Sequence, residues 1–285
     1  MKFGLIPINI GIADTEQMVG LAQLAESLGF ESVWTFEHVI VPVDYQSKYP
    51  YNESGKMGAP PETPFVDPLI ALTAIAAATE TIRLGTGVNI LSQVNPLYMA
   101  KQAASLDFIS NGRFMLGIGI GWLREEFEAL GVPFERRGAR FDDYVEAMKK
   151  VWAGDVVEHQ SDFINWSGFK SYPLPVQKPH LPVIMGGAAG KIFERTAKLG
   201  NGWFAPMGTV DELKPALDKL RAACDAQGRD FSEIEITCMW PPGADKKAVE
   251  SLEEVGVSRM VGMIPALGPD PVAGLSKIAE EFIGA

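Results

Sequence analysis

Residues 84–121, LGTGVNILSQVNPLYMAKQAASLDFISNGRFMLGIGIG, contain one complete strand–helix–strand unit. The apolar segment 82–90 predicts a buried strand. Asn95 followed by Pro96 is typical of a helix N-terminus, because Asn caps the first turn and proline tolerates the first helical position. Asn111-Gly112 predicts the end of that helix, and 113–118 predicts the next strand. Two strands joined by a helix in this way run parallel.

The same alternation continues in both directions along the chain. We expect strands at 2–8, 31–36, 82–90, 113–118, 182–185, 202–205, 233–239 and 259–264. Helical patterns lie between and after them, at 14–29, 67–79, 95–112, 141–152, 188–199, 210–226, 246–254 and 271–282. Eight alternating units predict an α/β fold in which a single (β/α)₈ TIM barrel takes up residues 1–285. An open, doubly wound sheet is the alternative.

Two stretches interrupt this rhythm, after strands two and four, at about 41–64 and about 155–172. The first is rich in Pro, Tyr, Gly and Asn, and irregular loops of this length tend to be functional. For the second we expect a small hairpin laid over a barrel end. Tyr45, Tyr49, Tyr51, Trp166 and Phe169 in these stretches favour an aromatic-lined pocket, or else they anchor the loops.

Composition narrows the class of function. The chain has 285 residues, 47% of them hydrophobic, and a net charge of −11, which argues against a nucleic-acid partner because such partners need basic surface. No apolar run approaches the length of a membrane span, and the N-terminal segment predicts a strand rather than a signal peptide. Cys224 and Cys238 form no CxxC pair, and we expect both to be reduced. We therefore expect a cytoplasmic protein with no membrane partner.

Candidate site residues follow four of the predicted strands. Glu37-His38 follows the second strand, Gly87-Val88-Asn89 ends the third, residues 117–122 end the fourth, and Gly186-Gly187 ends the fifth. In a barrel these strand ends share one rim, where active sites lie. His38 is the candidate for proton transfer near neutral pH, and Glu37 for orienting its imidazole. The alternative is that both are ordinary polar groups of the rim.

Two glycine-rich segments resemble nucleotide motifs only in part. In GIGIGW the Rossmann spacing would need glycine at Trp122, so we interpret Gly119 and Gly121 as allowing close approach of a ring, or as a tight loop exit. GGAAGK is one residue short of a P-loop, yet glycines leading into a helix would bind phosphate; the alternative is a plain turn. The sequence shows no metal-binding motif, and we expect no metal.

Three segments together resemble the luciferase-like monooxygenase superfamily, and within it the coenzyme F-420-dependent branch. They are LGTGVNILSQVNPLYMAKQ (84–102), SNGRFMLGIGIGWLREEFEALGVPFERRG (110–138) and PVIMGGAAG (182–190). The second is long and specific. The resemblance covers essentially the whole chain and is weakest across the two insertions.

The resemblance implies a cofactor ring at the C-terminal mouth of the barrel, with substrate stacked on its exposed face. It implies a cis peptide at Gly87-Val88 and makes Glu37-His38 the catalytic pair. It assigns cofactor contacts to His38, Gly87, Val88, Asn89, Gly119, Gly121, Gly186, Gly187 and Ala188. Trp122 departs from the pattern, because a sugar-phosphate dehydrogenase of this family has a catalytic glutamate there.

Three functions remain open. The first is F-420-dependent hydride transfer to or from a small organic substrate, with Lys191 and Arg195 nearest to the anionic tail of the cofactor. The second is an FMN-dependent monooxygenase supplied by a separate cofactor reductase. The third is a non-catalytic flavin-binding protein. In each case we expect a homodimer, and the sequence names no substrate.

Overall fold

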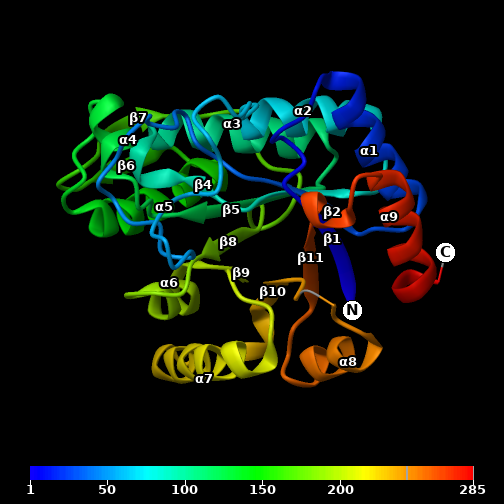
Figure 1. Ribbon diagram of the computed structural model, residues 1–285. Helices are drawn as coiled ribbons and strands as arrows, with labels where there is room; N and C mark the ends of the chain where they lie inside the picture. The colour runs from blue at the N-terminus through cyan, green and yellow to red at the C-terminus, as the bar shows by residue number, and fades with distance from the viewer. Residues whose placement is uncertain (242, 285) are drawn as a thin grey trace.

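Eight parallel strand positions close into a barrel in the computed structural model, which describes residues 1–241 and 243–284 (Figure 1). The barrel strands are β1 (Lys2–Ile6), β2 (Ser32–Thr35), β3 (Arg83–Thr86) with β4 (Asn89–Ile90), β5 (Phe114–Gly119), β8 (Val183–Gly186), β9 (Gly202–Ala205), β10 (Glu235–Met239) and β11 (Arg259–Met263). β1 pairs with β2 on one side and with β11 on the other, while β3 and β4 pair with β5. The predicted closed barrel is confirmed, and the open sheet is wrong.

Helices cover the outside of the barrel (Figure 1). They are α1 (Thr15–Ser27), α2 (Pro68–Ala78), α3 (Pro96–Ile109), α4 (Arg124–Ala129), α5 (Arg137–Ala153), α6 (Ile192–Leu199), α7 (Val210–Gln227), α8 (Lys246–Glu254) and α9 (Pro271–Ile278), which a π-helical turn (Ala279–Ile283) extends. Asn95 caps α3 and Pro96 begins it, as predicted. No described helix is long and apolar enough to cross a bilayer.

The interior of the barrel is filled by one small cluster of side chains. It consists of Ile6, Trp34, Met115, Ile184, Phe204 and Val261. Gly85 makes room for this cluster, because a Cβ there would lie 2.3 Å from the Trp34 indole. The end of the barrel that holds the strand N-termini is filled by the buried Arg259, whose guanidinium binds Glu31 and Glu235. The barrel interior is therefore filled by side chains, and in barrels of this kind ligand sites lie at the mouth, where the strands end.

The second insertion is a hairpin, as predicted, but it does not lie over a barrel end. Its strands are β6 (Val157–Gln160) and β7 (Asn165–Phe169), and it follows α5 rather than a barrel strand. Lys150 of α5 donates to the Glu158 carbonyl, His159 bonds Asp143 at 2.8 Å, and Arg136 at the N-cap of α5 bonds Asp162 at the hairpin tip at 2.6 Å. The hairpin thus runs along the flank of α5.

The helix after β8 begins later than predicted. α6 starts at Ile192 and not at residue 188. Gly187 and Gly190 have φ angles of 119° and 65°, which are outside the helical region. Residues 187–191 therefore form a short loop between the strand and the helix.

Candidate active site

His38 lies where β2 leaves the barrel. Trp34, four residues earlier, fills the barrel interior, and Phe36 packs against the same cluster. The side chain of the buried Asn9 replaces a neighbouring strand beside Phe36. It accepts from the Phe36 N–H at 3.0 Å and donates to the Phe36 carbonyl at 2.9 Å. Side chains alternate along an extended chain, so His38 belongs to the inward side at the mouth.

Aromatic rings and one carboxylate surround the His38 imidazole. Phe65 and Trp122 meet it edge-on, with ring centroids 5.8 and 6.0 Å away. Its Nδ1 lies 3.1 Å from Oε2 of Glu126, which stands in α4. Only 10% of the His38 side chain is exposed. The imidazole is therefore held in a fixed orientation in largely apolar surroundings.

Glu126 was not among the residues expected in the site. It is buried, and its Oε1 accepts from the backbone N–H groups of Val39 (2.6 Å) and Ile40 (3.3 Å). The sequence does contain a signal for it: Leu123, Glu126 and Phe127 are spaced i, i+3, i+4 and all face inward. A carboxylate on the apolar stripe of a helix indicates a buried partner.

Glu37 does not orient His38, contrary to expectation. One oxygen of its carboxyl accepts from Asn89 Nδ2 at 3.1 Å, and the other accepts from the Ile90 N–H. Burial raises the pKa of Glu37 to about 8, and the negative charges of Glu126 and Asp67 add to the effect. Glu37 thus supports the chain just after the break between β3 and β4, and its proposed catalytic role stays a prediction.

That break contains the cis peptide Gly87-Val88 expected from the resemblance. The Val88 side chain fits among glycines of the neighbouring strands. A Cβ at Gly119 would lie 2.7 Å from Val88 Cγ2, and a Cβ at Gly186 would lie 2.5 Å from Val88 Cγ1. At Gly117 a Cβ would lie 1.7 Å from the Thr86 carbonyl oxygen. These glycines are needed to pack Val88 and the strand break, and Val88 forms the floor of the mouth.

Gly121 serves a similar purpose, because a Cβ there would meet Ile90 at 2.7 Å and Phe127 at 2.8 Å, and its φ is 87°. Close packing of the protein itself therefore accounts for Gly119, Gly121 and Gly186. Their predicted contacts with a cofactor would use backbone atoms and stay predictions.

The loop after β8 differs from the other glycine sites, because it is open. Apart from Gly187 itself and its chain neighbours, the described residues place a single atom within 4 Å of a Cβ at Gly187, the Tyr51 hydroxyl at 3.5 Å. In the described part of the chain, the backbone N–H groups of residues 188–190 donate to no protein acceptor, and the first turn of α6 follows them. Such N–H groups attract anions. Of the two cations expected here, Lys191 is exposed, whereas Arg195 is paired with Asp142.

The first insertion, residues 41–64, carries aromatic side chains to the mouth. Trp122 contacts Tyr45 and Tyr49, with centroids 5.8 and 5.2 Å apart, and Tyr49 contacts Tyr51 at 5.5 Å. This chain of rings extends from the end of β5 to the end of β8. Trp166 and Phe169 pack against each other on the hairpin instead, so they do not join this group.

Helix α4 anchors the first insertion. Glu125 Oε1 accepts from the N–H groups of Gln46 (2.7 Å) and Ser47 (3.2 Å), and Ser47 Oγ accepts from the Arg124 N–H at 3.0 Å. Desolvation opposes ionisation of Glu125, but these donors outweigh it and lower its pKa to about 2. Neighbouring glutamates on one short helix thus hold both the start of the loop and His38.

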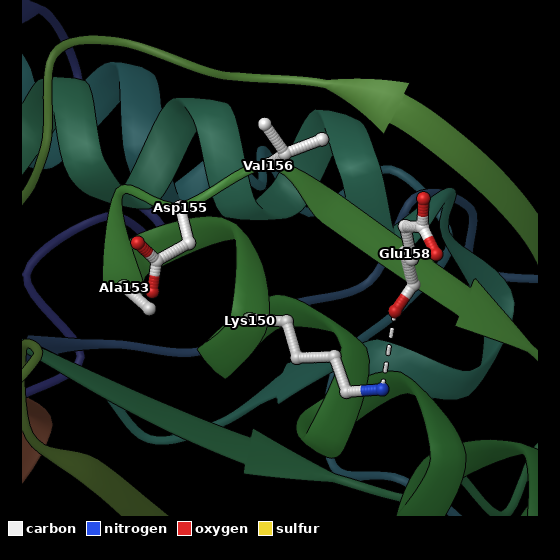
Figure 2. Close-up of a pocket in the computed structure, with 5 residues that line it drawn as sticks. All are labelled: Lys150, Ala153, Asp155, Val156 and Glu158. Carbon is white, nitrogen blue, oxygen red and sulfur yellow. Dashed lines mark hydrogen bonds between the residues drawn. The ribbon is translucent and has the colours of Figure 1, made fainter.

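An open hollow of about 360 Å³ lies elsewhere, and Figure 2 shows the residues that line it. It is lined by Lys150, Ala153, Asp155, Val156 and Glu158. These residues surround the C-terminal end of α5, which is directed away from the mouth. Among the described residues, no three His, Cys, Asp or Glu side chains could together hold a metal ion.

Similarity to known proteins extends along almost the whole chain. The family of luciferase-like monooxygenases matches residues 7–267. An uncharacterised protein of Mycobacterium tuberculosis is 32% identical over 92% of each chain. The 5,10-methylenetetrahydromethanopterin reductase of Methanolobus tindarius is 26% identical over 92% of this chain and 72% of its own. The FMNH₂-dependent dimethylsulfone monooxygenase of Pseudomonas putida is 27% identical over 54% of this chain and 43% of its own.

Two solved structures share the fold. One is the coenzyme F-420-dependent tetrahydromethanopterin reductase of Methanopyrus kandleri, with a TM-score of 0.78 and 19% identity over 99% of this chain and 98% of that one. The other is an F-420-dependent secondary alcohol dehydrogenase in complex with an F-420–acetone adduct, with a TM-score of 0.78 and 16% identity over the same shares. At these identities the likeness concerns the fold alone.

Proposed function

Because this chain belongs to the luciferase-like monooxygenase family, we propose that it is an oxidoreductase that transfers a hydride between coenzyme F-420 and a small organic substrate. The observation that carries the proposal is the His38 imidazole at the barrel mouth, fixed by Glu126 and enclosed by aromatic rings. A fixed proton donor or acceptor in apolar surroundings suits a reaction in which a proton accompanies a hydride.

The mouth has groups that fit such a cofactor. The free N–H groups of residues 188–190 and the N-terminus of α6 would bind a phosphate, and the exposed Lys191 lies beside them. Val88, which is partly exposed between β3 and β4, offers an apolar floor for a flat ring. Gly119 and Gly186 make room for the Val88 side chain, so no side chain of their own rises beside it from β5 or β8.

The chain's own residues then have distinct tasks. When bound, the deazaflavin supplies or accepts the hydride. His38 donates or accepts the accompanying proton, and Glu126 fixes the direction of its ring. Trp122 and Tyr49 restrict the access of water, which strengthens the electrostatic interactions inside the site.

The share of this chain that its relatives match favours F-420 over FMN as the cofactor. The relative named as a methylenetetrahydromethanopterin reductase matches 92% of this chain, whereas the FMNH₂-dependent monooxygenase matches 54%. The FMN-dependent monooxygenase is the second candidate, because the same mouth would accept either ring.

Cofactor titration tests the proposal. We expect F-420 to bind at least about tenfold more tightly than FMN, a difference of roughly 1.4 kcal/mol, in equilibrium titrations followed by fluorescence. A deazaflavin without its phosphate should bind more weakly than F-420, because the N–H groups of residues 188–190 would lose their anion. FMN binding that equals or exceeds F-420 binding would favour the monooxygenase instead.

A further inference from the structure

We propose that Glu126 is the positioning residue of His38: it holds a proton on Nδ1, so that Nε2 is the hydrogen-bond acceptor presented to the mouth. This assignment concerns the protein without ligand, and only its effect on turnover rests on the proposed function. The residue comes from α4, which neither the helical periodicity nor the strand-end rule brought into the site.

The hydrogen bonds around Glu126 favour this arrangement of protons. Oε1 accepts from the backbone N–H groups of Val39 and Ile40, which can only donate. Oε2 faces Nδ1 of His38 at 3.1 Å. In the proposed arrangement Glu126 is a carboxylate, which can only accept, and Nδ1 therefore carries the hydrogen of this bond. In a neutral imidazole the other nitrogen is then an acceptor.

Nε2 is the atom that this arrangement makes available. In the described part of the chain it has no hydrogen-bond partner, and it is not sealed from solvent as other unpaired buried atoms are, for example Nδ1 of His159. The neighbouring rings of Phe65 and Trp122 offer it no acceptor. A proton held by a substrate or cofactor would therefore find an acceptor at Nε2.

Glu126 has a second task that any test must separate from the first. Its bonds to Val39 and Ile40 hold the chain where it leaves β2. Removing the carboxylate would disturb both. Replacing it by the isosteric amide separates them, because the two backbone donors require the amide oxygen at the position of Oε1. The amide nitrogen then takes the position of Oε2 and donates to Nδ1.

Glu126→Gln should therefore change the tautomer of the His38 imidazole and keep the hydrogen bonds to the backbone of Val39 and Ile40. Nδ1 becomes the acceptor, and the proton moves to Nε2. We expect nitrogen-15 NMR of the ligand-free protein at about pH 8, above the usual titration range of imidazole, to show this exchange of protonated and bare nitrogens. The chain has three histidines, and a His38→Asn variant identifies the relevant signals.

The matched control is Glu128→Gln, on the exposed side of the same helix, which should leave the signals of His38 unchanged. A wild-type His38 with a bare Nδ1, or with protons on both nitrogens, would overturn the proposal even if the variant did not fold. So would a folded Glu126→Gln protein whose imidazole keeps the wild-type pattern.

Turnover provides a separate measurement. If the proposed function holds, Glu126→Gln should lower kcat by roughly 10²–10⁴-fold, as a wrong tautomer does elsewhere, with little change in F-420 binding. If Glu126→Gln changes the tautomer of His38 but leaves kcat unchanged, Glu126 has no role in turnover. It would then only organise the site of the ligand-free protein. Failure of the wild type to bind F-420 would reject the proposed function, while the NMR result would still decide the assignment.

Discussion

The Glu37 carboxyl holds a proton at neutral pH, since its pKa is raised to about 8. A protonated carboxyl needs an acceptor. Asn89 Oδ1 is buried and unpaired as the amide is oriented, and a half-turn of this amide would present the oxygen to the Glu37 proton. The pair would then be neutral, which suits its place behind the mouth, away from solvent.

The raised pKa predicts how stability depends on pH. Between about pH 4.5 and 8 the folded protein keeps a proton on Glu37 that the unfolded chain has lost. This contribution to the free energy of unfolding is complete below pH 4.5 and is lost as the pH rises to 8. Urea titrations across this range should show a weaker decline for Glu37→Gln than for the wild type, because the amide has no proton to lose.

Glu125 supplies a control of opposite sign. Its pKa is lowered to about 2, so the stability that it contributes is present above its ordinary pKa and is lost as the pH falls from 4.5 toward 2. Glu125→Gln should flatten the acid side of the profile and leave the side between pH 4.5 and 8 as in the wild type. A Glu37→Gln profile parallel to the wild type would contradict the raised pKa.

His38 carries the prediction for catalysis. His38→Ala should reduce turnover by roughly 10²–10⁴-fold, because it removes the proton donor or acceptor, while cofactor affinity changes much less. Steady-state kinetics and cofactor titration measure the two effects separately. His180, which precedes β8 at the opposite end of the barrel, gives the matched control, and His180→Ala should keep turnover close to the wild-type value. Wild-type turnover in His38→Ala would make His38 a rim residue only.

At the level of elements, α4 connects the site to the loop that covers it. Its first turn places Glu125 against the backbone of residues 46–47 and Glu126 against His38 and the two residues after it. The inward-facing positions Leu123, Glu126 and Phe127 span little more than one helical turn, and isolated helices of six residues are unstable in water. The segment is helical because its buried side chains pack against the barrel, so this short spacing was too weak a signal to predict the helix.

Loss of the Glu125 tether should free the start of the loop. In Glu125→Ala the amides of Gln46 and Ser47 lose a charged acceptor, and such a hydrogen bond is worth roughly 1.5–3 kcal/mol. We expect hydrogen exchange at these two amides to be at least about tenfold faster, as measured by NMR or mass spectrometry. Glu128→Ala, one turn away on the exposed face, should leave it unchanged. Equal protection in both variants would mean that Trp122 and Tyr45 hold the loop without α4.

The strands and long helices were predictable because their signals are local: apolar runs, caps and glycine stops. The rim position of His38 followed from strand order alone. The partner of His38 did not follow, since it depends on which of two buried carboxyls faces the imidazole, and that is decided by packing across 88 residues of sequence. The start of α6 was missed because positive φ at Gly187 and Gly190 is not visible in an otherwise helical pattern.

At the level of the whole molecule, the closed barrel depends on an ion cluster at the end opposite the mouth. Arg259 of β11 is fully buried and binds Glu31, which precedes β2, and Glu235 of β10. Lys2 of β1 also binds Glu235 from a half-exposed position. The cluster therefore joins the first strands of the chain to the last.

Arg259→Met should destabilise the protein by about 3–5 kcal/mol, because two largely buried carboxylates lose their shared cation. Lys2→Met is the matched control, and a change of about 1 kcal/mol or less is expected there, since the ammonium is partly solvated. Urea unfolding of the three proteins measures both effects. Similar decreases in the free energy of unfolding of the two variants would show that the cluster does not depend on Arg259.

Barrel closure also has a consequence for synthesis on the ribosome. β1 pairs with β11, with Lys2 opposite Arg259 in the register, so one edge of β1 stays unpaired until β11 has been synthesised. At about 5–20 residues per second, an interval of roughly 13–50 s separates the appearance of the two strands. During that time the nascent chain exposes an apolar edge that can pair with other chains. Slower translation of the segment between β1 and β11 should therefore raise the demand for chaperones and lower the yield of folded protein.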